Sequence, residues 1–167
     1  LKNSKMYTQE LRIPKERIGA LVGIKGRMKR KIQRRTDTQI AVNADGEVYI
    51  SGEDSLRVFM ALTVIRAISR GFNPDIALVL LEEDNTLEVV DMTEFSRKNS
   101  NDLTRIRARV IGTNGKAREM LESLTKTKFS VYGKTVALIG TIPDVILAKA
   151  AVEKLLQGAP HNNVYHF

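Results

Sequence analysis

A block of glycines and threonines occurs twice in this chain of 167 residues, and this repeat constrains the fold more than any other feature. At an offset of 89 residues, Gly23 aligns with Gly112 and Gly26 aligns with Gly115. The same offset aligns Thr36 with Thr125, Thr38 with Thr127 and Val42 with Val131, and one-residue gaps then align Val48 with Val136, Gly52 with Gly140, Ala61 with Ala148 and Gly71 with Gly158. Because random sequences rarely place four pairs of glycines in register, we interpret the pattern as an internal duplication.

The first copy predicts the order strand, helix, helix, strand, strand, helix. Hydrophobic periodicity, Pro at a helix start and Gly at a helix end support this order. The predicted elements are a strand over 7–13, a helix over 14–23, an amphipathic helix from Gly26 to about Thr36, a hairpin that turns at 43–46, and a long helix over 55–71 whose apolar face carries Leu56, Phe59, Leu62, Ile65 and Ile68.

The second copy predicts the same order. Its expected elements are a strand over 87–90, a helix with Leu103, Ile106 and Val110, a helix with Met120, Leu121 and Leu124, strands over 129–131 and 136–139, and a final helix from Pro143. Between the copies, residues 76–81 form an apolar run, which would not stay exposed in a linker. We therefore expect this run to be a helix packed on one of the copies.

Charge divides the chain into three blocks. Residues 1–71 carry 15 basic and 7 acidic side chains, residues 72–94 carry 7 acidic and no basic ones, and residues 95–167 carry 12 basic and 5 acidic ones. This segregation predicts two basic modules joined by an acidic connector. The domain limits that we expect are 1–71 and 87–158 for the modules, 72–86 for the connector and 159–167 for a C-terminal tail.

Composition excludes several kinds of site. The chain has no cysteine, and its two histidines, His161 and His166, lie within the last seven residues, where disorder or a partner contact is a better explanation than metal binding. Gly115-Lys116 is followed by Ala117, so a P-loop is absent. We expect no catalytic residue, no metal and no cofactor, and we expect a cytoplasmic protein without a membrane span.

Two glycine-bracketed turns, over 21–26 and 110–115, carry the chemistry. A turn of the form Gly-x-x-Gly between two helices, within a unit of the order β-α-α-β-β-α, is the mark of the type I KH domain, and both turns resemble it. Glycines permit positive φ and remove Cβ atoms, so a nucleic-acid backbone can approach amides at a helix start. Such a turn clamps about four nucleotides of single-stranded RNA. The predicted fold class is therefore α+β, with two tandem type I KH domains packed together.

The candidate RNA-binding residues follow from this resemblance and from the surrounding charge. Bases would lie in an apolar groove whose expected walls are Ile18, Leu21, Val22, Ile40, Val110, Ile111 and Phe129. The full candidate set is Gly23, Ile24, Lys25, Gly26, Arg27, Lys29, Arg30 and Ile40 in the first copy, and Gly112, Thr113, Asn114, Gly115, Lys116, Arg118 and Phe129 in the second.

The two copies differ in charge beside the turn. The first has seven cations within residues 25–35, whereas Glu119 and Glu122 offset Lys116 and Arg118 in the second. Arginines on the helix before the second turn, Arg105, Arg107 and Arg109, would either replace these cations or be ordinary surface residues. We expect the first copy to bind RNA more strongly, since phosphate contacts supply much of the affinity.

The whole chain resembles the archaeal members of the partner-of-Nob-one family of ribosome-assembly KH proteins. Besides the two turns, residues 71–74, 76–78 and 87–91, in and beside the connector, carry this resemblance. It implies binding to the single-stranded 3′ end of small-subunit ribosomal RNA during assembly and pre-rRNA processing. It also implies contact with the endonuclease that trims this RNA and with the α subunit of archaeal initiation factor two. We expect a monomer.

Two other classes of function stay open at this point. A KH protein of transcription or RNA decay would show the same turns, and a protein-binding scaffold could use the same basic faces. The apolar residues of the connector further suggest that the two domains dock and act on one RNA strand together.

Overall fold

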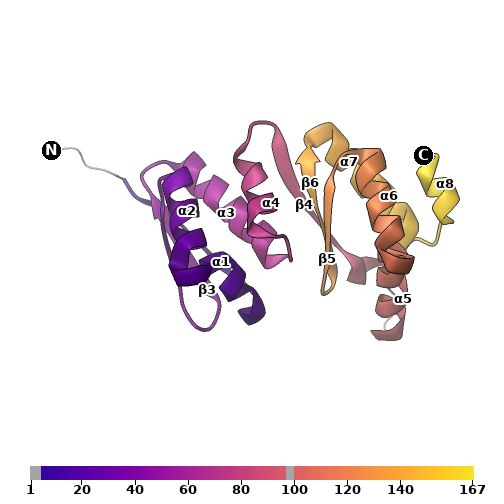
Figure 1. Cartoon of the computed structure of the whole chain (residues 1–167), viewed down its shortest axis with the longest axis horizontal. Coiled ribbons are helices and arrows are strands. Elements are labelled where there is room, and N and C mark those ends of the chain that lie inside the picture. The colour runs from indigo at the N-terminus through magenta and orange to yellow at the C-terminus, as the bar shows by residue number, and fades with distance from the viewer. Residues whose placement is uncertain (1–4, 97–99) are drawn as a thin grey trace. The chain divides into compact units, whose positions relative to one another are not determined.

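The structure, a computed structural model, describes residues 5–96 and 100–167. The chain divides into two compact units, one that extends to Glu82 and one that begins at Glu83 (Figure 1). Each unit has a three-stranded antiparallel sheet and helices, in the predicted order. The limits 1–71 and 87–158 stay a prediction for the KH part of each unit.

The first unit is built around the sheet β1-β3-β2. Its third helix begins where the Asp54 side chain accepts a hydrogen bond from the amide of Leu56, as expected of an N-cap. The elements are β1 (Tyr7–Arg12), α1 (Ile18–Val22), α2 (Arg27–Thr36), β2 (Gln39–Val42), β3 (Glu47–Gly52) and α3 (Ser55–Ser69), with short 3-10 helices at Lys15–Arg17 and Ile24–Gly26.

The second unit repeats this topology with the sheet β4-β6-β5. Thr141 caps its last long helix by accepting from the amide of Asp144. The elements are β4 (Asn85–Asp91), α5 (Ser100–Ile111), α6 (Lys116–Thr125), β5 (Lys128–Tyr132), β6 (Thr135–Thr141) and α7 (Ile142–Leu156), with 3-10 helices at Met92–Phe95 and Thr113–Gly115.

The aligned threonines form the same buried contact in both units. The Thr36 hydroxyl donates to the carbonyl of Ile32 at 2.7 Å and lies 2.7 Å from the Thr38 hydroxyl. Thr125 and Thr127 repeat this pair at 2.7 Å. Each pair joins the end of a helix to the start of an edge strand, which explains why both copies carry Thr-x-Thr.

The predicted apolar face of the third helix was partly wrong. Leu56 and Phe59 are 64% and 59% exposed, whereas α3 buries the neighbouring face through Val58, Ala61 and Val64. Apolar residues occur on nearly every side of this helix, so periodicity alone could not select the buried side. Ile65 itself lies on the predicted face and is fully buried.

The apolar run between the copies packs on the first unit, as predicted. It forms α4 (Pro74–Ala77) and a 3-10 helix at Leu78–Leu81, and both contact α3. Leu78 and Leu80 are buried. Burial beside α3 already accounts for these residues, so they no longer argue for docking of the two domains, which stays a prediction.

The C-terminal tail corrects a second expectation. Residues of the tail form α8 (His161–Tyr165), which packs against α6 and α7. Val164 is 4% exposed and belongs to the core of the second unit. One apolar side chain among polar neighbours was too weak a periodic signal to predict this helix.

Within residues 5–96 and 100–167, the structure contains no helix that is long and apolar enough to cross a membrane.

Candidate nucleic-acid interface

The two glycine turns have nearly the same backbone conformation. In the first turn, Gly23 has φ 74° and ψ 177°, Lys25 has φ 54° and Gly26 has φ 75°. The corresponding values in the second turn are 75° and 173° at Gly112, 55° at Asn114 and 74° at Gly115. Three of the four residues in each turn thus have positive φ, which favours glycine at the ends and explains the tolerance for Asn at the third position.

The two glycines of a turn have different roles. A Cβ atom on Gly23 would lie 2.8 Å from Cβ of Met28 and 2.9 Å from its backbone nitrogen, and one on Gly112 would lie 2.6 Å from the same atoms of Ala117. The first glycine therefore lets the next helix pack closely. At Gly115 the nearest atom would be 3.9 Å away, in the guanidinium of Arg118. At Gly26 the nearest atom would be a guanidinium nitrogen of Arg30, 2.9 Å away. At the second glycine of each turn, a Cβ atom would thus meet only the end of a flexible side chain.

Each turn leads directly into a helix of ten residues, α2 after Gly26 and α6 after Gly115. The first amides of a helix lack intrahelical partners and favour anions. Ile24 projects from the first turn with 77% of its surface exposed, and Thr113 and Asn114 are exposed at the same place in the second. The arrangement presents backbone donors and an open surface to a phosphate chain.

Most candidate cations of the first unit lie beside its turn. Lys25, Arg27 and Arg30 are exposed and Lys29 is half-buried. No carboxylate in the described part of the chain lies within ion-pair distance of these four. Lys31 differs, since its Nζ atom lies 3.8 Å from Asp75. The first turn therefore keeps a cluster of cations available to an anion.

The second unit offers fewer such cations. Lys116 is exposed, but the guanidinium of Arg118 lies 3.2 Å from Glu122. Two of the three arginines on the preceding helix have partners: Arg105 pairs with Asp102 at 2.7 Å, and Arg109 donates to the carbonyl of Ala159. Whether these arginines contact RNA stays open.

The predicted groove walls need a correction. Ile40 and Phe129 are each only 4% exposed, and Leu21 and Val110 are fully buried, so these side chains belong to the cores. These residues lie on the inward face of their strand or helix. A sequence pattern marks that face as apolar, but it does not distinguish a core residue from a groove wall. Ile18, Val22 and Ile111 are half-buried and stay candidates for the walls.

Sequence analysis did not predict two side-chain contacts with the strands β2 and β5, those of Gln33 and Glu122. Gln33 Oε1 accepts a hydrogen bond from the amide of Ile40 at 2.9 Å. Glu122 Oε2 accepts one from the amide of Phe129 at 3.1 Å. The two residues are 89 positions apart, so the repeat offset was the signal that could have identified them.

The C-terminal helix borders the second turn. A hollow of about 460 Å³ is lined by Ala108, Arg109, Gly112, Thr113, Lys116, Ala117, His161 and Tyr165. His161 Nε2 lies 2.9 Å from the carbonyl oxygen of Arg109, which ties α8 to α5. The tail thus forms part of the surface around the second turn, a role that the sequence did not suggest.

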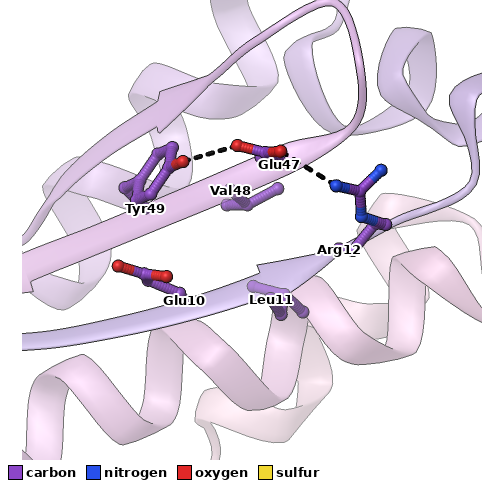
Figure 2. A pocket seen from close by; sticks show the side chains of 6 residues that line it. All are labelled: Glu10, Leu11, Arg12, Glu47, Val48 and Tyr49. Carbon is purple, nitrogen blue, oxygen red and sulfur yellow. Dashed lines mark hydrogen bonds and ion pairs between the residues drawn. The ribbon is translucent and has the colours of Figure 1, made fainter.

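A separate hollow of about 390 Å³ lies on the solvent side of the first sheet (Figure 2). Glu47 accepts hydrogen bonds from Arg12 at 2.9 Å and from the Tyr49 hydroxyl at 2.6 Å. The hydrogen bond from Tyr49, followed by the bond from Asn43 and the positive charge of Arg12, lowers the pKa of the Glu47 carboxyl. The contact between Arg12 and Glu47 joins β1 to β3, and these strands carry none of the candidate RNA-binding residues.

No cluster of three or more His, Asp or Glu side chains that could hold a metal occurs among the described residues.

Comparison with known proteins identifies both units. A KH-domain model matches residues 8–67, and a model described as a eukaryotic type KH domain (KH-domain type I) matches residues 86–167. A KH domain-containing protein of Methanocaldococcus jannaschii is 45% identical over 161 residues, which cover 94% of this chain and 70% of that protein. A pre-rRNA-processing protein PNO1 of Debaryomyces hansenii is 28% identical over 102 residues, and this chain covers only 40% of its length.

A solved structure gives the same result. The archaeal Dim2 protein of Pyrococcus horikoshii, in a complex with initiation factor 2α and rRNA, is 40% identical and has a TM-score of 0.90. The match covers 96% of this chain and 91% of that one. The chain therefore belongs to the partner-of-Nob-one (PNO1, Dim2) family of tandem KH-domain proteins.

Proposed function

We propose that this chain binds single-stranded RNA through both glycine turns. The observation that carries the proposal is the near identity of the two turns. Each has three positive φ values and a second glycine, at the start of a ten-residue helix, where a Cβ atom would meet only an arginine guanidinium. Phosphates would contact the amides of each turn and the cations beside it, while bases would extend toward β2 or β5. RNA binding requires no catalytic group, so the chain acts as a binding protein.

The proposed RNA is the 3′ end of small-subunit ribosomal RNA during ribosome assembly. The Pyrococcus relative was crystallised with rRNA and initiation factor 2α, and the Debaryomyces relative is named as a pre-rRNA-processing protein. Because the chain belongs to this family, we propose that its protein partners are the initiation factor and the endonuclease that trims this RNA. The chain would act in the cytoplasm as a monomer.

A double substitution in each turn tests the binding mode. Ile24→Asp with Lys25→Asp places negative charge on the phosphate path, and Asp tolerates the positive φ of residue 25. We expect RNA affinity to fall at least tenfold with unchanged helical circular dichroism. Thr113→Asp with Asn114→Asp is the same test of the second turn.

The chain supplies a matched control. Ile24→Thr with Lys25→Asn gives the first turn the sequence of the second and keeps its geometry. This variant should lose only the contribution of one cation. Equal affinities for the wild type and both Asp variants would remove the turns from the mechanism.

The identity of the RNA is tested by crosslinking and sequencing in cells. Recovery of small-subunit rRNA 3′ ends supports the proposal. A pull-down tests the other two classes of function. Retention of polymerase or exosome subunits would indicate transcription or decay, and partner binding that survives loss of both turns would indicate a protein scaffold.

A further inference from the structure

The hollow at the second turn is bordered on one side by the C-terminal helix α8. Gly112, Thr113 and Lys116 line it from the turn and the start of α6, and His161 and Tyr165 line it from α8. Its volume of about 460 Å³ falls within the range of small-ligand sites, about 300–1,000 Å³. The hollow is therefore continuous with the turn that we propose to hold the phosphate chain.

Two aromatic rings form the wall that α8 contributes. His161 and Tyr165 lie one helical turn apart, with ring centroids separated by 6.2 Å and planes inclined at 54°. The Nε2–H group of His161 donates to the carbonyl of Arg109 at 2.9 Å, which fixes the orientation of the imidazole. Tyr165 packs partly against the core of the second unit. Both side chains are half-buried, so the wall is held in place and still has open ring surface.

The charge of the lining favours one kind of ligand. Its charged side chains are Arg109 and Lys116, and none of the described lining residues is acidic. A base can stack on an aromatic ring, and the phosphate of the same nucleotide is attracted by cations. A nucleotide thus supplies both the planar group and the negative charge that suit this hollow.

The first domain has no such wall at the equivalent place. Helix α4 begins three residues after Gly71, and α8 begins three residues after the aligned Gly158. However, α4 (Pro74–Ala77) contains no aromatic residue, and its Asp75 lies 3.8 Å from the amino group of Lys31. Cations gather beside the first turn, whereas aromatic rings stand beside the second.

We propose that α8 extends the RNA-binding surface of the second domain. The hollow holds one nucleotide that flanks those clamped by the turn, with its base against the ring of His161 or Tyr165 and its phosphate near Lys116. Stacking then supplies affinity to a domain whose turn has few available cations. The inference rests on the proposed RNA binding and adds a nucleotide site outside the turn.

The test is a double-mutant cycle in the full chain with Ile24→Asp and Lys25→Asp, so that the second domain dominates binding. The probe is a ten-nucleotide single-stranded RNA that this chain selects from a randomised pool, together with derivatives that each carry one abasic nucleotide. One base outside the run of about four that the turn clamps should matter. Its removal should lower the affinity about tenfold, the size of one stacked base.

Two variants each remove one ring from the wall. Tyr165→Leu keeps an apolar side chain against the core, and His161→Gln keeps a donor for the carbonyl of Arg109. In at least one of them, removal of the flanking base should have little effect, because its stacking surface is already lost. Phe167→Leu is the matched control, since this ring belongs to the same tail, lies 4.0 Å from the amino group of Lys154 and does not line the hollow. It should leave the loss on base removal at about tenfold.

Photo-crosslinking of the wild type to the same RNA gives a second measurement that needs no variant. Mass spectrometry should place a crosslink on His161 or Tyr165. If a ring variant loosens α8, which a shift of the Val164 amide resonance would reveal, the crosslink decides.

The outcomes separate this inference from the proposed function. If the Asp variants of the turns weaken RNA binding, but both ring variants still lose affinity on removal of the flanking base and no crosslink falls on α8, the inference is wrong and the proposed function stands. The inference is also wrong if only the wild type, and not the chain with the disabled first turn, selects an RNA. If the wild type selects none, both are wrong.

Discussion

The two glycines of the first turn should respond very differently to alanine. At Gly23, the new Cβ would lie 2.8 Å from Cβ of Met28, at φ 74° and ψ 177°. A non-glycine residue in this region costs about 1–3 kcal/mol, and overpacking costs about 1–3 kcal/mol more. We expect Gly23→Ala to lower the free energy of unfolding of the first domain by about 3–5 kcal/mol.

At Gly26, the new Cβ would meet only the flexible guanidinium of Arg30, at 2.9 Å. Its left-handed conformation costs alanine about 1–2 kcal/mol, and the smaller entropy of the unfolded chain returns roughly 0.4–1 kcal/mol. Gly26→Ala should therefore cost only about 1 kcal/mol while it adds a methyl group on the side open to RNA. Its effect on RNA affinity should exceed its effect on stability.

Urea unfolding followed by circular dichroism measures the first effect, and RNA titration measures the second. Because the chain has two units, the transition must be fitted with one step for each unit. Gly112→Ala and Gly115→Ala repeat the comparison in the second domain, where the corresponding nearest distances are 2.6 and 3.9 Å. Equal destabilisation by the two substitutions in a turn would refute the assignment of separate roles.

Three further predictions follow from the same structure. If four to six phosphates are neutralised, the logarithm of RNA affinity should fall against the logarithm of salt concentration with a slope of about −3 to −4, and a flat salt dependence would contradict the phosphate contacts. Double-stranded RNA should bind much more weakly than single-stranded RNA. Lys126 has φ 56°, in the left-handed region that glycine adopts more readily than lysine. Lys126→Gly should therefore stabilise the second domain by about 0.5–1 kcal/mol in urea unfolding. A loss of stability would show that the lysine side chain has another role. The hydrogen bond from the Tyr49 hydroxyl lowers the pKa of Glu47, so it stabilises the fold above the ordinary pKa of the carboxyl, and this contribution is lost as pH falls through the lowered value. The difference in unfolding free energy between wild type and Tyr49→Phe should therefore shrink across that acid range. A constant difference would contradict this prediction.

The sequence by itself determined the repeat, the order of elements and the position of both turns. Gly-x-x-Gly is a local pattern whose conformation depends on which residues tolerate positive φ. The turn can therefore be predicted without knowledge of long-range contacts. The sequence also predicted the burial of residues 76–81, because an apolar run does not stay exposed. The candidate cations beside Gly26 followed from composition, since exposed charges on a short helix need no tertiary partner.

Tertiary structure alone decided which of the candidate side chains are buried. Ile40 and Phe129 looked like groove walls, but packing of helices on one face of each sheet buries them and leaves their amides at the edge. Gln33 and Glu122 reach those amides across seven residues, a contact that depends on how the helix meets the strand. Tertiary packing also brought α8 beside the second turn, because the burial of Val164 depends on the space between α6 and α7. Periodicity describes one helix or strand at a time, whereas these contacts form only where two elements pack together.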